Sequence, residues 1–240
     1  EMVRMTSHDL KNPLQAAMAN LELLRDDLTH DGRHEVVTSI NAIEDQLDRM
    51  ERIINGTLDL ERIRSGTLRM DLCKTEHIVQ SAVDELRHMA QTKALNLNAN
   101  VAPNTPDLWG DQEQIRRTLV NLIENAVKFT PQDGEVHVAA QGQGDDVLFT
   151  VSDTGIGIPP ALHAQVFDRF FRGRQPGTEH ISGSGLGLSL VKAIVDNHGG
   201  KVWLESEAGA GTTFYVLLPA ASARASTDNL SAITGLRNTE

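Results

Sequence analysis

The stretch that decides the fold class reads Asn121-Leu122-Ile123-Glu124-Asn125-Ala126-Val127-Lys128-Phe129-Thr130. Asn121, Asn125 and Lys128 fall at positions i, i+4 and i+7, so the three side chains project from one face of a predicted helix. Amide oxygens suit a hard cation such as Mg²⁺, and a lysine ammonium can meet a phosphate. Taken alone, the stretch is better explained as a solvated helix face, so the segments around it must decide.

The next informative segment is Asp153-Thr154-Gly155-Ile156-Gly157-Ile158-Pro159, which follows an alternating apolar stretch at 147–152. Gly155 and Gly157 remove side chains where the backbone approaches a bound group. The Asp153 carboxylate can accept a hydrogen bond from an exocyclic amine, although an Asx turn is the common alternative at such a junction.

A third segment, Gly183-Ser184-Gly185-Leu186-Gly187-Leu188-Ser189, leads directly into a predicted helix. Backbone N–H groups and a helix N-terminus placed in this way can hold an anion. One glycine loop is a weak signal. The order of an asparagine-bearing helix, an Asp-x-Gly-x-Gly turn and a Gly-x-Gly-x-Gly helix start rarely arises by chance, and it indicates a nucleotide site.

Residues 160–182, between the two glycine segments, form a long connection that we expect to be a lid over the site. We expect its phenylalanines to pack the lid down; they are Phe167, Phe170 and Phe171. Its arginines either reach a triphosphate or keep the loop soluble; they are Arg169, Arg172 and Arg174.

The fold class predicted from apolar periodicity is α+β. Apolar residues spaced three and four apart between 10 and 28 and between 36 and 54 predict a helical hairpin, which would pair with a second copy into a four-helix bundle. Beyond it, short strands are expected at 68–72, 95–101, 135–141, 147–152, 201–206 and 212–218, and helices at 77–94, 111–129 and 186–197. We therefore expect a dimerisation hairpin (1–65), a two-layer α/β sandwich (66–219) and a flexible tail or linker (220–240).

Composition narrows the class of partner. The 240 residues carry a net charge of −11, which disfavours a nucleic-acid binder.

Cys73 is the single cysteine, so we expect a small buried side chain in a reducing cytoplasmic setting. No apolar run is long enough to span a membrane. The chain begins inside a helical pattern without a capping residue. We therefore expect the protein to have an upstream part, and a membrane anchor would lie in that part.

A histidine motif, Ser7-His8-Asp9-Leu10-Lys11-Asn12-Pro13-Leu14, lies in the first helix of the hairpin. His8 and Asn12, four residues apart, share a flank away from the apolar seam, so we expect His8 to be exposed. Pro13 has no N–H for the carbonyl of Asp9 and should kink the helix beside His8.

Over 2–219, the chain resembles the sensor histidine kinases of two-component signalling. Residues 7–14 resemble the H-box, 121–130 the N-box, 153–159 the G1 box, 167–172 the F-box, 183–188 the G2 box and 209–214 the last glycine box. The resemblance implies a phosphotransfer hairpin followed by a Bergerat-type ATP-binding domain.

This resemblance also implies roles for individual residues. His8 would be the phosphoacceptor, with Asp9 as its base; Asn12 would orient a water for dephosphorylating a partner's phosphoaspartate. Asn121 and Asn125 would hold Mg²⁺. The ATP-binding residues would be Asn121, Asn125, Lys128, Phe129, Asp153, Gly155, Gly157, Arg172, Gly183, Gly185, Leu186, Gly187 and Thr213.

The expected function is autophosphorylation of His8 from ATP and transfer to an aspartate of a response-regulator receiver domain, with phosphatase activity on that regulator as a further expectation. Two alternatives are an ATPase of the same fold and a dimeric scaffold that binds nucleotide without chemistry. Relatives that hydrolyse ATP carry a catalytic Glu where this chain has Asn121, and a scaffold predicts damaged motifs. The asparagine at position 121 and the intact motifs of this chain both favour the kinase.

Overall fold

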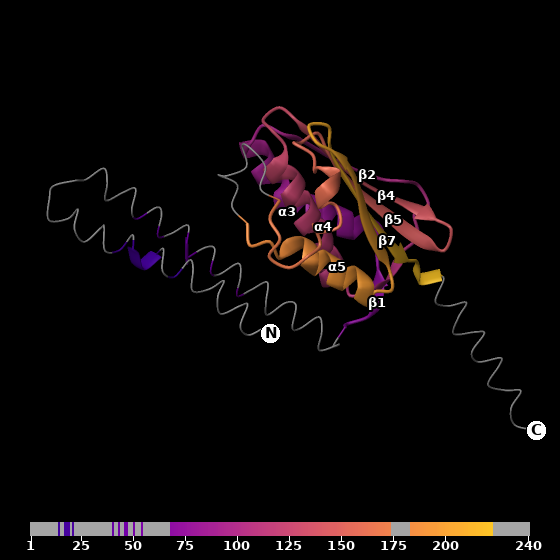
Figure 1. Cartoon of the computed structure of the whole chain (residues 1–240). Coiled ribbons are helices and arrows are strands. Elements are labelled where there is room, and N and C mark those ends of the chain that lie inside the picture. The colour runs from indigo at the N-terminus through magenta and orange to yellow at the C-terminus, as the bar shows by residue number, and fades with distance from the viewer. Residues whose placement is uncertain are drawn as a thin grey trace, which may run out of the picture.

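The computed structural model (Figure 1) describes residues 68–173 and 183–222, together with the helical residues 14, 17–19, 21, 40, 43, 46, 47, 50 and 54. Most of the predicted hairpin and the tail beyond 222 lie outside these residues. In chain order the elements are β1 (Asp71–Cys73), α3 (Thr75–Thr92), β2 (Asn96–Val101), β3 (Leu108–Gly110), α4 (Gln112–Phe129), β4 (Glu135–Gln143), β5 (Asp146–Asp153), the 3-10 helix η1 (Pro160–Leu162), α5 (Gly187–Asn197), β6 (Lys201–Glu207) and β7 (Gly211–Pro219).

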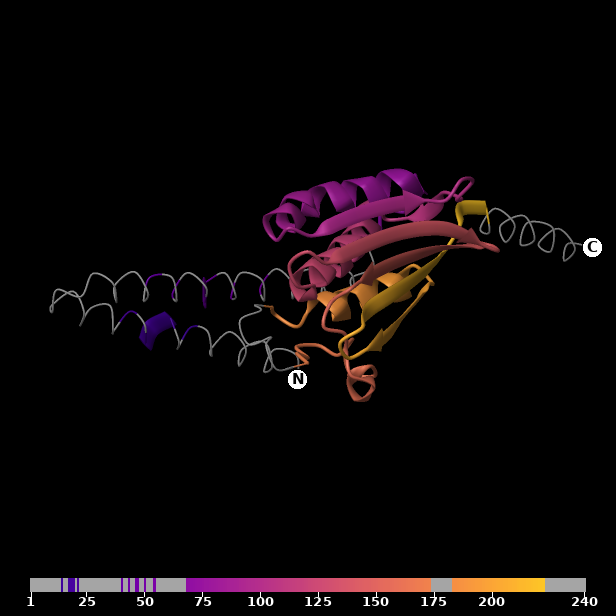
Figure 2. The same cartoon turned by 90° about the horizontal axis from the view of Figure 1, so that it is seen from above.

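Five strands form one sheet in the order β2-β4-β5-β7-β6, which Figure 2 shows from above. Strand β2 pairs with β4 in parallel, and the remaining pairs in this sheet are antiparallel. Strands β1 and β3 form a separate antiparallel pair. The predicted α+β class is therefore confirmed.

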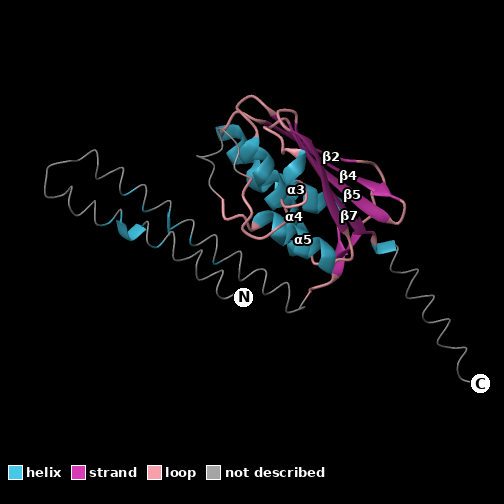
Figure 3. Ribbon diagram, in the orientation of Figure 1, coloured by secondary structure: helices cyan, strands magenta, loops and turns pink. Residues whose placement is uncertain are grey.

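The three helices cover one face of the five-stranded sheet, so the domain has two layers (Figure 3). Alternation along the central strands turns one set of apolar side chains toward the helices, where they are buried. These inward residues are Val136, Val138 and Ala140 on β4, Val147, Phe149 and Val151 on β5, and Phe214, Val216 and Leu218 on β7.

Helix α5 ends as its sequence predicts. Gly199 takes a left-handed φ of +72°, its N–H donates to the Asp196 carbonyl at 3.0 Å, and the Gly200 N–H donates to the Val195 carbonyl at 2.9 Å. This pair of bonds is a Schellman ending, which a glycine favours because it has no Cβ to clash in that conformation.

Some boundaries differ from the prediction. The first strand is Asp71–Cys73 rather than 68–72, and α3 begins and ends two residues earlier than expected. At its start, the buried Thr75 donates its hydroxyl to the Pro106 carbonyl at 2.6 Å, a contact between residues distant in the chain. Strand β3 was not predicted, because three residues are too few to show alternation.

Cys73 is completely buried, as predicted, and its thiol donates to the Gly110 carbonyl, with 3.2 Å between sulfur and oxygen. Within the described parts of the chain, no helix has both the length and the apolar character needed to cross a bilayer.

Candidate nucleotide site

Helix α4 supplies one wall of the site. The Asp111 carboxylate caps its start by accepting from the Gln114 N–H at 3.2 Å. One face of the helix packs into the core through residues such as Ile115, Leu119 and Leu122. The opposite polar face, with the predicted Asn121, Asn125 and Lys128, is only half-buried.

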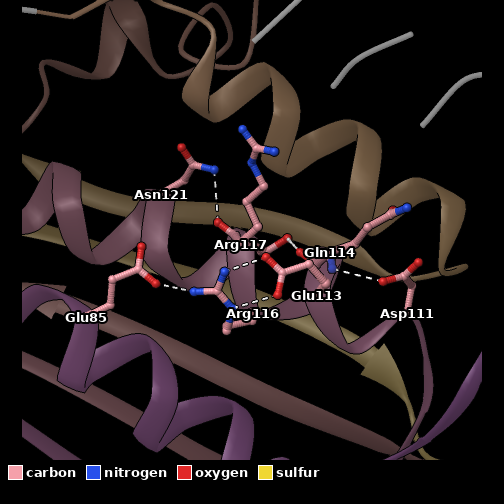
Figure 4. Close-up of polar contacts among 8 residues, drawn as sticks. Glu85, Asp111, Glu113, Gln114, Arg116, Arg117 and Asn121 are labelled. Carbon is pink, nitrogen blue, oxygen red and sulfur yellow. Dashed lines mark hydrogen bonds and ion pairs between the residues drawn. The ribbon is translucent and has the colours of Figure 1, made fainter. Parts of the chain in front are cut away.

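Asn121 faces the start of α5. Its amide N–H donates to the Arg117 carbonyl at 2.9 Å (Figure 4), so its Oδ1 is the atom left for other contacts. A Cβ added to Gly187 would lie 3.1 Å from that oxygen. The structure therefore brings the asparagine-bearing helix and the third glycine segment together, 66 residues apart in the chain.

An outward amide oxygen fits a hard cation such as Mg²⁺, which takes few protein ligands and keeps several waters. Among the described residues, no group of three or more His, Cys, Asp or Glu side chains could hold a metal ion.

Lys128 is placed on the expected face, but its charge is already engaged. Its Nζ lies 2.7 Å from a carboxylate oxygen of Glu124, one turn earlier on α4, and both side chains are partly exposed. Each of these two groups therefore reduces the charge that the other presents to a ligand.

The end of α4 is held by residues that the sequence analysis did not single out. The Lys93 ammonium donates to the carbonyls of Val127 and Lys128 at 2.9 and 2.7 Å. The Thr130 hydroxyl donates to the Ala126 carbonyl at 2.6 Å. Burial lowers the pKa of Lys93 from its ordinary value. The two carbonyls that accept from it lie at the C-terminus of α4, where a cation interacts favourably with the helix dipole.

Asp153 lies at the end of β5, as predicted. Its Oδ1 accepts from the Gly155 N–H at 2.8 Å and from the Thr212 N–H at 3.3 Å. The first bond is the Asx turn that was the alternative interpretation. Both bonds end on Oδ1, so Oδ2 is the oxygen that a ligand would meet. Burial raises the pKa of Asp153 to about 6, against the opposing effect of the two N–H donors.

The glycines after Asp153 are required because neighbouring backbone atoms leave no room for a Cβ. A Cβ on Gly155 would lie 2.6 Å from the Phe129 carbonyl oxygen, and a Cβ on Gly157 would lie 1.9 Å from that of Glu207. Gly157 also has a positive φ of +67°. These glycines were predicted to make room for a ligand, but close packing of the loop on α4 and β6 already explains them.

The turn between β6 and β7 supports this loop from the other side. The Gly209 N–H donates to the Ile156 carbonyl at 2.7 Å. The Ser206 hydroxyl accepts from the Ile158 N–H and donates to the Gly211 carbonyl, each at 2.8 Å. Sequence reasoning missed Ser206; the only signal was a serine just ahead of the last glycine box.

Thr213, predicted from the sequence as an ATP-binding residue, follows Thr212 on the strand next to this loop. It lies on β7, and its hydroxyl is 3.0 Å from that of Ser152 on β5. Strand β7 pairs Thr212, not Thr213, with Asp153, so alternation along the strand turns the Thr213 side chain to the opposite face of the sheet from Asp153.

The third glycine segment leads into α5, which has no side-chain cap, whereas Asp111 caps α4. Leu186 is buried with Leu190 and Ile194. The Phe170 N–H donates to the Gly185 carbonyl at 2.8 Å, and a Cβ on Gly185 would lie 2.7 Å from the Phe170 carbonyl carbon. The described start of the lid is thus joined to the glycine segment through its backbone.

The prediction that phenylalanines pack the lid down is confirmed for two of them. Phe167 lies edge-on to Phe214 with ring centroids 6.4 Å apart, and Phe170 packs against the cluster around Leu186. Arg172 lies within the described part of the lid. Arg174 falls outside the described residues, as do His8, Asp9 and Asn12.

Two family models match the chain. Residues 1–66 match the His Kinase A (phospho-acceptor) domain, and residues 110–222 match the family of histidine kinase-, DNA gyrase B- and HSP90-like ATPases. Among curated relatives, the alginate biosynthesis sensor protein KinB of Pseudomonas aeruginosa is 32% identical over 222 residues, which is 91% of this chain and 36% of KinB. The sensor histidine kinase RppB of a Synechocystis strain is 31% identical over 89% of this chain and 47% of RppB. The chain thus spans less than half the length of either relative.

Solved structures share the fold. Full-length ShkA in complex with AMPPNP has a TM-score of 0.67 and 27% identity, covering 92% of this chain and 46% of ShkA. The histidine kinase ThkA in complex with the response regulator protein TrrA has a TM-score of 0.74 and 23% identity, covering 92% of this chain and 61% of the ThkA chain.

Proposed function

Because the chain belongs to the two-component sensor histidine kinases, we propose that it transfers the γ-phosphoryl group of ATP to His8 and then to an aspartate of a response-regulator receiver domain. The domain division proposed with it is a phosphotransfer hairpin at 1–65, an ATP-binding domain at 66–219 and a tail from 220. We also propose that this part of the protein works in the cytoplasm, where ATP is available.

The single observation that carries the proposal is the convergence of three distant segments on one site. Helix α4 presents Asn121 to Gly187 at the start of α5, while the carbonyl of Phe129 accepts from the Ile156 N–H at 3.2 Å in the loop after Asp153. We call Asp153 with loops 153–158 and 207–212 the base end. Asn121, Asn125 and segment 183–187 are the phosphate end.

At the base end, Asp153 Oδ2 would accept a hydrogen bond from the adenine amine. At the phosphate end, the uncapped start of α5 offers N–H groups to phosphate oxygens, and Asn121 and Asn125 would hold Mg²⁺. When bound, Mg²⁺ would neutralise phosphate charge. The AMPPNP-bound relative of similar fold supports ATP as the ligand.

In the proposed step, a ring nitrogen of His8 forms a bond to the γ-phosphorus as the bond from that phosphorus to the bridging oxygen breaks. ADP leaves with the electron pair. Asp9 would hold the N–H on the other ring nitrogen, which fixes the tautomer and raises the nucleophilicity of His8.

The proposal is favoured over ATP hydrolysis by the environment of Glu124, an acid on α4. Glu124 lies 2.7 Å from Lys128, and Asn121 stands where the hydrolytic relatives carry their base. An ion-paired carboxylate is a poor general base for water because its lone pairs are engaged by the cation.

We further propose that the hairpin forms a homodimer. Five large aliphatic side chains of the predicted seams are between 41% and 53% exposed in the single chain, and a second copy would cover them. They are Leu14, Leu21, Ile40, Leu47 and Ile54. The proposed receiver-domain partner is of the class found with ThkA, whose chain has the same fold.

The proposal is tested by incubating the chain with γ-labelled ATP and Mg²⁺ while following both protein-bound label and released phosphate. We expect acid-labile, base-stable label on the protein, and none on His8→Gln. Released phosphate without protein-bound label would support the ATPase instead. Bound nucleotide with neither product would support the scaffold.

A further inference from the structure

The polar face of α4 continues one turn before Asn121, to Arg117. Positions 117, 121, 125 and 128 are separated by four, four and three residues and therefore share one side of the helix. All four side chains are half-buried. Arg117 was not among the site residues expected from the sequence.

The neighbouring Arg116 lies on the side of α4 that faces α3. It contacts Glu85 on α3 and Glu113 on its own helix, and its Nε lies 2.9 Å from Glu113 Oε2. In Figure 4, Arg116 points toward Glu85, whereas the side chain of Arg117 extends to the side on which Asn121 lies. The two adjacent arginines therefore serve different faces of α4.

The order of contacts along α4 gives the direction of a bound nucleotide. Phe129 adjoins the base end through its carbonyl, and Asn121 adjoins Gly187 at the phosphate end. Eight residues of helix separate these two points by about 12 Å, and Arg117 lies about 6 Å further in the same direction. Arg117 is therefore on the side of Asn121 that is remote from the base, where the last phosphate of a triphosphate would lie.

The chemistry of the side chain fits that position. A guanidinium presents a planar fork of N–H donors that can bind two phosphate oxygens at once, which a lysine ammonium cannot do.

We propose that Arg117 binds the γ-phosphate oxygens of ATP and so distinguishes ATP from ADP. The inference rests on the proposed function, because it takes ATP as the nucleotide and segment 183–187 as the phosphate end. It adds to that function a residue that senses whether the transferable phosphoryl group is present.

The test is the ratio of affinities for Mg²⁺–AMPPNP and Mg²⁺–ADP, measured by calorimetry on the full chain. In Arg117→Gln we expect AMPPNP affinity to fall about tenfold or more and ADP affinity to change by no more than about twofold, since only the triphosphate meets the guanidinium. Arg117→Lys should retain part of the preference because it keeps the charge and loses the fork.

Arg116→Gln is the matched control. It removes the contacts with Glu85 and Glu113, so the melting temperature should fall while the ratio of the two affinities stays that of the wild type.

Equal losses for both nucleotides in Arg117→Gln, or no loss for either, would overturn the inference. The failure of the proposed function looks different: the wild type would prefer AMPPNP over ADP and yet place no phosphate on His8.

Discussion

At the base end of the site, added Cβ atoms on Gly157 and Gly211 would lie 1.9 and 2.0 Å from backbone carbonyl oxygens. At the phosphate end, a Cβ on Gly183 would meet nothing within 4 Å, and one on Gly187 would meet only the amide of Asn121. The base end is thus built from backbone packed on backbone, whereas at the phosphate end only Gly185, against Phe170, is packed in this way, and the helix start beside it is uncapped. A nucleotide would find its base pocket already formed and would itself complete the contacts around its phosphates.

The largest difference between the two ends is expected in unfolding free energy when a methyl group is added to one glycine at each end. Gly157→Ala combines a positive φ with a clash against the Glu207 carbonyl, so we expect the free energy of unfolding to fall by about 3 kcal/mol or more. Gly183→Ala has free space around it and should change that free energy by about 0.5 kcal/mol or less. Urea unfolding of both variants measures the difference, and similar losses would show that the two ends are packed alike.

The second change removes a side chain from the phosphate end. Asn125→Ala should weaken Mg²⁺–ATP binding by about tenfold to a hundredfold, because one polar ligand of the cation or phosphates is lost. Dimerisation should be unaffected. Calorimetry and light scattering measure the two properties, with Asn100→Ala, at an exposed position on β2, as the control. A monomeric Asn125→Ala protein would contradict the division of roles between hairpin and ATP-binding domain.

A smaller effect is expected at the base end from Ser206→Ala. The change leaves the Ile158 N–H and the Gly211 carbonyl without their 2.8 Å partner. We expect a loss of about 1–3 kcal/mol in unfolding free energy and a weaker affinity for ADP and AMPPNP alike. A selective loss of AMPPNP binding would place Ser206 with the phosphate end and would contradict the difference between the two ends.

The smallest effect is a pH dependence at the base end. Burial raises the pKa of Asp153 to about 6 from its ordinary 3.8, and the ionised carboxylate is the better acceptor for an amine. Nucleotide affinity should therefore increase about fivefold as pH rises through 6. The contribution to folding stability has the opposite sign and decreases as pH rises from about 4 to about 6, because the folded chain holds this proton more tightly than the unfolded chain.

Affinity titrations of wild type and Asp153→Asn between pH 5 and pH 7, a range of about two units around the shifted value, measure this effect. The difference between the two proteins cancels the titration of the phosphates themselves. Identical profiles would remove Asp153 from the binding site.

Much of the fold followed from periodicity. The spacing of apolar residues predicted the cores of α3, α4 and α5, and alternation predicted the five strands of the main sheet, because both patterns lie within one element. Strand β3 was missed because its three residues form a strand only by pairing with β1.

The site residues that sequence reasoning missed act across long chain separations. Ser206 meets Ile158 and Lys93 meets Val127, contacts that span 48 and 34 residues. No periodic pattern marks either side chain, and the only signal for Ser206 was its place just ahead of the last glycine box. Gly155 and Gly157 were found from their motif, but the groups that exclude a Cβ there became visible only with the packing of Phe129 and Glu207.

The measurement that tests the central claim most directly is amide hydrogen exchange with and without Mg²⁺–AMPPNP. Without nucleotide, the amides of Ile156, Ile158 and Gly209 should already be protected, because each donates to a protein acceptor. The amides of Gly183 and Gly187 should exchange quickly and become protected only when nucleotide binds. Rapid exchange at both ends before binding, or protection at both, would contradict the account.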